Sequence, residues 1–234
     1  GNADLIVDGN SFLASLNRFV SFVANAAYTY KNKYTISASG RRDASNLFGA
    51  GTNDKWTPLW SVGAGWDINK EKFFDARWAS RLKLRTSYGV NGNADPSRSS
   101  VTTLLYGSNS PYTQTPTAMI DQFKNQGLRW ETVYTFNGGL DYESSNGRIH
   151  GSIDFYRKKA TNLFGTVPVD YTGVANSLIT KNVSKIKGSG WDFAINTLNL
   201  KGKFSWSTQL NMNLNHDKVI TNYLTSTQDS NYVT

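Results

Sequence analysis

The chain has 234 residues, with 13% aromatic and 18% charged side chains, 20 glycines and no cysteine. No stretch approaches the roughly 18 consecutive apolar residues of a membrane-spanning helix, and the lack of cysteine excludes a disulfide framework and thiolate metal sites. The formal net charge of +8 comes from lysines and arginines scattered along the chain, not gathered in one basic stripe, which argues against nucleic-acid binding.

Alternation of apolar and polar residues, bounded by turn residues, predicts about eight β-strands and an all-β, antiparallel fold. In chain order the predicted strands cover residues 19–30, 34–42, 59–67, 82–90, 132–142, 148–158, 187–198 and 204–216. The alternation is clearest in the last strand, FSWSTQLNMNLNH, where one face is apolar and the other is Ser, Gln and Asn. No long amphipathic helix is predicted, and residues 69–81 hold at most a helical turn or two.

The predicted connections alternate between short and long. Hairpin-length links join strands at residues 31–33, 143–147 and 199–203, and the 68–81 link is of middling length. The intervening connections, by these boundaries, run about 16, 41 and 28 residues. Outer-membrane barrels have short turns at one end and long extracellular loops at the other, so the pattern favours a transmembrane β-barrel.

Two other architectures fit the alternation as well. An antiparallel sheet with one face on a core, such as a soluble carbohydrate-binding β-sandwich, has the same period. A small self-contained outer-membrane barrel, serving as an adhesin or structural protein, is the second alternative. The many Gly, Ser and Ala residues on the polar faces would underfill a narrow barrel, however, and therefore favour a wide wall.

Five stretches carry a resemblance to a known family. They are YTISASGRRDASNLFG (34–49), WTPLWSVGAGWDINKEKFF (56–74), LKLRTSYGVNGN (82–93), LRWETVYTFNGGLDY (128–142) and GRIHGSIDFYRKKATNLF (147–164). In this order the series resembles the barrel of the SusC/RagA family of TonB-dependent transporters from the Bacteroidetes outer membrane. One local departure is Ala44-Ser45-Asn46, where the family often has Gly-Ser-Ser after Arg-Arg-Asp.

The resemblance implies that residues 1–234 are part of a barrel of about 22 strands, with the plug domain absent from this chain. It also implies an importer of oligosaccharides or oligopeptides in the outer membrane. The expected partners are outer-membrane lipid, a SusD-like surface lipoprotein, a glycan or peptide substrate, and TonB through the missing N-terminal part. The chain opens on GNADLIVDGN, without an initiator Met or an apolar signal sequence, which indicates a mature protein or a piece of one.

The sequence offers little to catalysis. His150 and His216 are the only histidines and no metal-binding spacing is present, so we expect no enzyme activity, no metal and no cofactor. Aromatic residues beside Ser, Thr, Asn and Gln in the long loops suit stacking on a sugar or peptide, although such rings also pack loop against loop. The candidate substrate-binding residues are Trp56, Tyr106, Tyr112, Phe164 and Tyr171, and the residues expected to face the lumen are Gln209, Asn211, Asn213 and His150.

Overall fold

Ten strands form two antiparallel sheets in the computed structural model, which describes residues 18–45, 56–93, 102–122, 125, 127–168 and 178–222. The strands are β1 (Phe19–Tyr30), β2 (Tyr34–Ser45), β3 (Trp56–Asp67), β4 (Ala79–Asn93), β5 (Thr103–Asn109), β6 (Pro116–Gln122), β7 (Glu131–Ser144), β8 (Ile149–Pro168), β9 (Leu178–Leu200) and β10 (Trp206–Asn222). The only helix in the described ranges is a 3-10 turn, η1 (Ile68–Lys70), and none there is long or apolar enough to cross a membrane.

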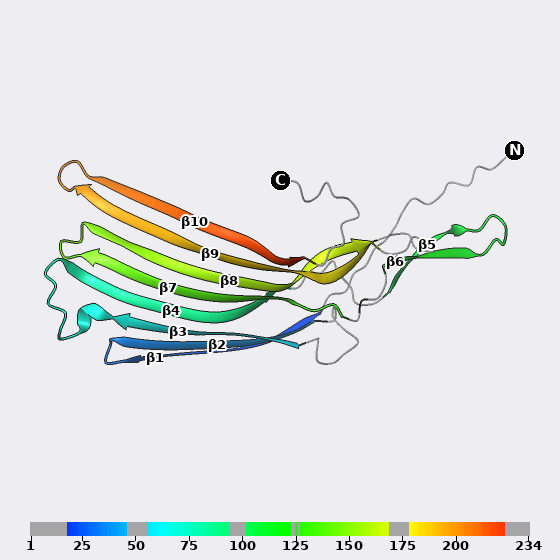
Figure 1. The fold of residues 1–234 in the computed structure, drawn as a ribbon, viewed down its shortest axis with the longest axis horizontal. Helices are drawn as coiled ribbons and strands as arrows, with labels where there is room; N and C mark the ends of the chain where they lie inside the picture. Colours follow the sequence, from blue (N-terminus) through cyan, green and yellow to red (C-terminus); the bar gives the residue numbers. More distant parts are fainter. Residues whose placement is uncertain are drawn as a thin grey trace.

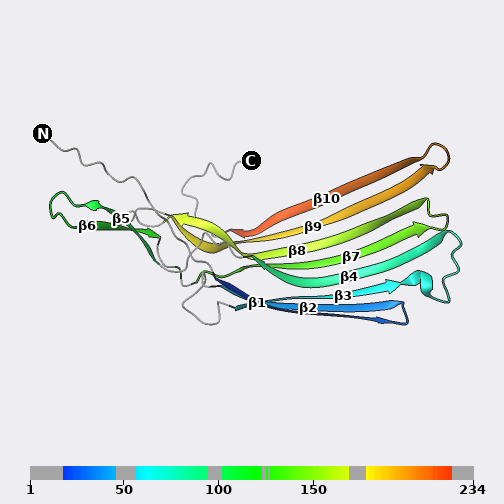
Figure 2. The ribbon, with the colours of Figure 1, turned by 180° about the vertical axis from the view of Figure 1, so that it is seen from behind.

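Eight of the strands form one long, curved layer (Figure 1) in the order β1-β2-β3-β4-β7-β8-β9-β10. The links 31–33, 68–78, 145–148 and 201–205 all lie at one end of this sheet, the short-turn end, in both views (Figures 1 and 2). The β5–β6 hairpin extends from the opposite, long-loop end. The predicted all-β antiparallel architecture is confirmed, and the links 31–33, 145–148 and 201–205 are short, as expected.

The long-loop end differs in detail from the prediction. β8 and β9 continue well beyond their predicted ends, into the 28-residue loop expected at 159–186, and residues 169–177 between them lie outside the described residues. β2 and β3 also extend beyond their predicted bounds into the loop expected between them, and the expected 91–131 loop contains β5 and β6. Strand ends such as KKATNLFGTVP in β8 have no clean period of two, so the alternation signal stops before the strand does.

The register gives the sheet two chemically distinct faces, because directly opposed residues in a ladder point to the same side. One row of the polar face runs through Thr35, Gly65, Arg85, Gly139, Asp154, Asp192 and Asn213. The adjacent row of the apolar face runs through Tyr28, Ile36, Ala64, Thr86, Gly138, Phe155, Trp191 and Leu214. The predicted alternation therefore produces a continuous polar face and a continuous apolar face.

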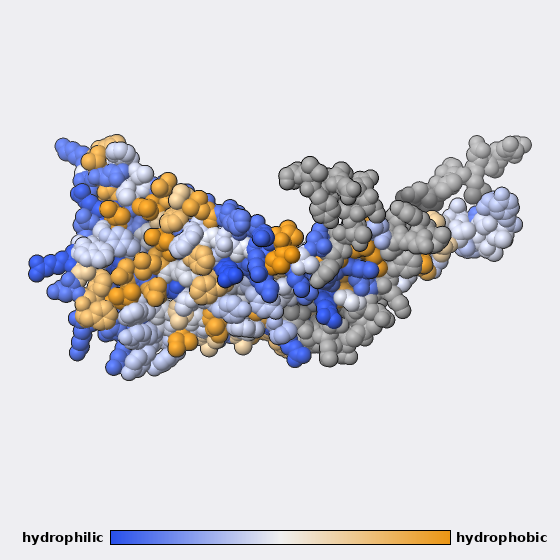
Figure 3. All heavy atoms as spheres, viewed as in Figure 1, coloured by the Kyte–Doolittle hydropathy of each residue, from blue (hydrophilic) through white to orange (hydrophobic). Residues whose placement is uncertain are grey.

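The apolar face is left open to its surroundings. Phe22 is 64% exposed and Leu210 is 59% exposed, and hydrophobic side chains spread over the strands near the short-turn end (Figure 3). Since β5 and β6 pair only with each other, no second sheet packs on the eight strands within the described ranges. The β-sandwich alternative is therefore wrong.

The sheet also does not close on itself. The strand order begins at β1 and ends at β10, and these two strands do not pair with each other. A self-contained eight-stranded barrel requires that pairing, so this alternative is wrong too. The described strands form an open segment of wall.

Candidate functional site

A charge network crosses three strands of the polar face. Arg85 on β4 donates from Nε to Asp141 Oδ2 at 2.9 Å and from Nη2 to Asp141 Oδ1 at 2.8 Å. The same Nη2 lies 2.9 Å from Oδ1 of Asp154 on β8. Arg85 reaches that carboxylate across β7 because Gly139 has no side chain: a Cβ there would overlap the Asp154 carboxylate and lie 3.0 Å from Arg85 Nη2.

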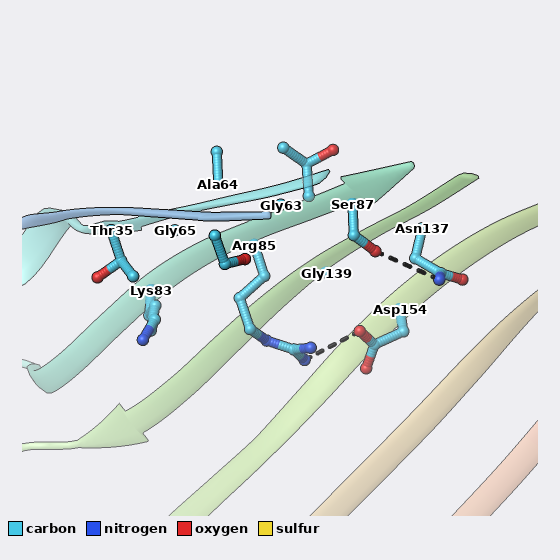
Figure 4. Close-up of a pocket in the computed structure, with 12 residues that line it drawn as sticks. Thr35, Gly63, Ala64, Gly65, Lys83, Arg85, Ser87, Asn137, Gly139 and Asp154 are labelled. Carbon is cyan, nitrogen blue, oxygen red and sulfur yellow. Dashed lines mark hydrogen bonds and ion pairs between the residues drawn. The ribbon is translucent and has the colours of Figure 1, made fainter. Parts of the chain in front are cut away.

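An open hollow of about 270 Å³ surrounds this network. Its polar lining includes Thr35, Lys83, Ser87, Asn137 and Asp154, and its glycines come from β3 and β7. Figure 4 shows Arg85 and Asp154 pointing toward each other, with Ala64 directed to the other side of the sheet. The arrangement offers both charges and neutral hydrogen-bonding groups to a polar molecule.

The polar face holds every acidic residue of the eight strands. These residues are Asp43, Asp67, Glu131, Asp141, Glu143, Asp154, Asp192 and Asp217. In the described part of the chain, no group of three His, Cys, Asp or Glu side chains is arranged to hold a metal ion. Because charged carboxylates are favourably solvated, their gathering on this face suits it to contact with water.

The four residues expected to face the lumen all lie on the polar face. Asn213 donates to Asp192 Oδ1, and Asn211 stands opposite Ala194 in the next strand. Gln209 and His150 share one row, through Asn196 of β9. Sequence reasoning missed the Arg85 network, although the period of two places its three residues on polar faces, because the register that joins them is not visible in one sequence.

Two of the candidate substrate-binding residues, Tyr106 and Tyr112, lie on the β5–β6 hairpin. Tyr106 belongs to β5 and is 79% exposed, and Tyr112 lies in the connecting turn and is 94% exposed. Trp56 is the first residue of β3, and Tyr171 lies outside the described residues. The hairpin thus presents two exposed rings at the long-loop end.

Phe164 occupies a different place from the one expected. It belongs to β8, not to a loop, and packs against the buried side chains of Leu128 and Trp130. The segment before β7, of which residues 125 and 127–130 are described, is bonded to β9: Asn125 donates to the Thr180 carbonyl at 2.7 Å. We conclude that Phe164 packs the segment against the strands.

A second set of hydrogen bonds lies at the short-turn end, where Lys33 contacts the link that follows η1. Glu71 in that link accepts hydrogen bonds from Tyr34 Oη, from Lys33 Nζ at 2.9 Å and from Trp66 Nε1 at 3.2 Å. These donors, the Tyr34 hydroxyl first and Lys33 second, lower the pKa of Glu71 from 4.5 to about 2, against a smaller opposing effect of burial. The bonds fasten the β3–β4 link to the β1–β2 hairpin.

Comparisons with known proteins agree with this geometry. The model of the TonB dependent receptor-like β-barrel matches residues 6–233. The chain is 32% identical over 228 residues to the TonB-dependent receptor SusC of Bacteroides thetaiotaomicron, an alignment that covers 94% of this chain and 22% of that receptor. It is 31% identical over 209 residues to the TonB-dependent receptor P26 of Formosa agariphila, covering 87% of this chain and 21% of that protein.

Solved structures show the same arrangement of strands. The RagAB peptide importer in its closed-closed state superposes with a TM-score of 0.78 at 25% identity, over 87% of this chain and 22% of that one. The siderophore receptor PirA of Pseudomonas aeruginosa, at 16% identity, shares the fold with a TM-score of 0.55, over 87% of this chain and 35% of that receptor. The chain spans about a fifth of the length of the curated relatives it matches.

Proposed function

Because this chain belongs to the TonB-dependent receptor β-barrel family, we propose that it forms part of the barrel wall of an outer-membrane importer of oligosaccharides or oligopeptides. In this proposal the remaining strands and a plug domain come from other parts of a longer protein. TonB supplies the energy from the inner membrane, and a SusD-like lipoprotein covers the extracellular side.

The observation that carries the proposal is the division of one open sheet into an exposed apolar face and a polar face that holds all the acidic residues. In a bilayer the apolar face contacts lipid and the polar face lines a water-filled lumen. The strands are long enough, since a crossing takes about 9–11 residues and β10 has 17. Strands of this length also project beyond the bilayer toward the long-loop end.

We assign cargo contact to the β5–β6 hairpin. Within the described residues Tyr106 and Tyr112 make no ring contact with another aromatic side chain, so their faces are free to stack on a sugar ring or a peptide. The amide and hydroxyl groups around them include Thr113 and Thr115, whose hydroxyl oxygens lie 2.8 Å apart. The RagAB complex is described as a peptide importer, which supports oligopeptides as one of the two substrate classes.

The test uses the full-length receptor in cells that depend on it for uptake of a labelled oligosaccharide or oligopeptide. Import should stop when TonB is absent, and uptake that persists without TonB would reject the proposal. Removing residues 103–122 should reduce uptake with no change in the amount of receptor in the outer membrane. This deletion is preferable to removing all of 91–131, because it keeps Leu128 and Trp130 in place.

Point substitutions test the contribution of the two tyrosine rings to uptake separately from that of the rest of the hairpin. Replacing both Tyr106 and Tyr112 with Ala should lower uptake, whereas replacing both with Phe, which keeps the rings, should lower it less. The control is Phe204→Ala, which removes another exposed ring, but at the short-turn end. Equal uptake by the alanine pair and the wild type would remove these tyrosines from cargo binding.

A further inference from the structure

Three lysines stand side by side on the apolar face, toward the long-loop end of the last three strands. Lys159 of β8 is directly opposite Lys187 of β9, and Lys187 is directly opposite Lys218 of β10. All three side chains are exposed. Arg157, also exposed, lies on the same face one row closer to the short-turn end. We call these four residues the cationic row.

The cationic row lacks compensating charge on its own face. Like charges placed directly opposite each other in a sheet are destabilising, and every acidic residue of the eight strands points to the other face. Among the residues that the structure describes, none of the four cations forms an ion pair. An anion from outside the chain would therefore relieve the repulsion.

The row lies at the border of the apolar area. On each of its strands the apolar face continues toward the short-turn end with large apolar side chains, such as Phe155, Trp191 and Leu214. Lys218 is twelve positions along β10 from Trp206, roughly 40 Å at about 3.4 Å per residue. A strand tilt of about 40° reduces this to roughly 30 Å of height, which is about the thickness of the hydrocarbon core.

We propose that the cationic row binds phosphate groups of phosphorylated glycolipids in the outer leaflet. The inference rests on the proposed function, in which the apolar face contacts the outer membrane with the long-loop end outside. A ligand that touches both the cations and the adjacent apolar side chains carries phosphate and acyl chains in one molecule, which is the chemistry of a lipid and not of a free anion. Arg157 supplies a planar fork for phosphate oxygens, and the lysines supply point charges.

The experiment measures lipid binding by the purified full-length receptor in a neutral detergent. The probes are bisphosphorylated lipid A, the same lipid after removal of its phosphates, and inorganic phosphate as a competitor. A cation near a membrane surface strengthens lipid binding by about fivefold, so changing Lys159, Lys187 and Lys218 together to Gln should weaken binding of lipid A by about 100-fold. Changing the same three residues to Arg should preserve binding, because the positive charge is kept. This variant separates the loss of charge from an effect of the substitutions on folding.

A matched control removes the same charge elsewhere. Lys158 is the chain neighbour of Lys159 but points to the polar face, and Lys201 and Lys203 lie in the turn at the opposite end. Changing these three lysines to Gln should leave affinity for lipid A close to that of the wild type. Binding should also weaken as salt is added, since exposed charges are screened.

Three results would overturn the inference: equal affinity in the Gln triple variant and the wild type, equal affinity for the dephosphorylated lipid, or displacement of the lipid by inorganic phosphate at equal concentration. Uptake by cells carrying the wild-type receptor is measured in parallel. TonB-dependent uptake together with any of these three results refutes the lipid site alone. Absence of the wild-type receptor from the outer-membrane fraction refutes the proposed function.

Discussion

Gly139 determines whether Arg85 can hold two carboxylates at once. A methyl group at this position would occupy the space of the Asp154 carboxylate, so Gly139→Ala should break the contact between Arg85 and Asp154 while leaving the two bonds to Asp141. The side chains are partly exposed, which limits the expected loss of unfolding free energy to at most about 1 kcal/mol. The measurement is the denaturant midpoint of the full-length receptor in detergent.

The neighbouring glycine is the control for this substitution. Gly138 points to the apolar face, where a Cβ would lie 3.8 Å from the ring of Phe136, an ordinary contact. Gly138→Ala should therefore leave the midpoint nearly unchanged. If Gly138→Ala destabilised the receptor as much as Gly139→Ala, backbone restriction and not the ion network would explain both results.

Glu71 makes the short-turn end sensitive to acid. Its pKa is lowered from 4.5 to about 2 in the folded protein, so its contribution to stability is complete above about 4.5 and is lost as the pH falls through about 2. Glu71→Gln should lower the melting temperature at pH 7, because Lys33 loses its ionic partner. The difference in Tm between wild type and variant should shrink between pH 4.5 and pH 2.

A Tm difference that stayed constant down to pH 2 would show that Glu71 acts through packing and not through its charge. Lys33→Gln is a useful companion, since it removes the same ion pair from the other side. Its effect on the melting temperature at pH 7 should have the same sign as that of Glu71→Gln.

At the scale of a single element, β10 shows how strongly the two faces differ. Leu210 is on the apolar face and Gln209, its neighbour, is on the polar face. A lysine on the lipid side near the bilayer midplane costs roughly 2–4 kcal/mol, so Leu210→Lys should reduce stability by about that amount in detergent or lipid. Gln209→Lys and Asn211→Lys should be tolerated, and equal tolerance at all three positions would reject the assignment of the faces.

The eight strands of the main sheet could be predicted because each has one face in an apolar medium and one in a polar medium. Residues 19–30 form β1 with the predicted bounds. The prediction weakened where the two faces of a strand no longer differ in polarity: β8 runs ten residues beyond its expected end at 158, and β5 and β6 were not recognised within a polar loop. Single-sequence patterns report the contrast between the two sides of a strand, not hydrogen bonding itself.

The candidate site shows the same limit. Positions expected to face the lumen, such as Asn213, could be placed on the polar face from alternation within one strand. The Arg85 network depends on the pairing of β4, β7 and β8, and Phe164 was assigned to a loop because its packing against Leu128 and Trp130 joins distant segments. Contacts between strands require the register, which one sequence does not contain.

At the scale of the whole molecule, the sheet has two unpaired edges. Neither the outer edge of β1 nor that of β10 pairs with another described strand, and exposed sheet edges do not occur within the hydrocarbon region of a membrane. In the proposed receptor both edges therefore pair with strands from the rest of the barrel. The apolar face likewise needs lipid or detergent, because its large apolar side chains are exposed along the sheet.

The 234-residue chain expressed alone should consequently fail to form a stable monomer. Exposed edges and an exposed apolar face both promote association, so we expect aggregation in plain buffer and no folded species that resists detergent on an unheated gel. The full-length receptor in the same detergent should show that folded species, because its barrel closes both edges. A monomeric, folded 234-residue chain in detergent-free buffer would contradict the assignment of the apolar face to lipid and of the two edges to neighbouring strands.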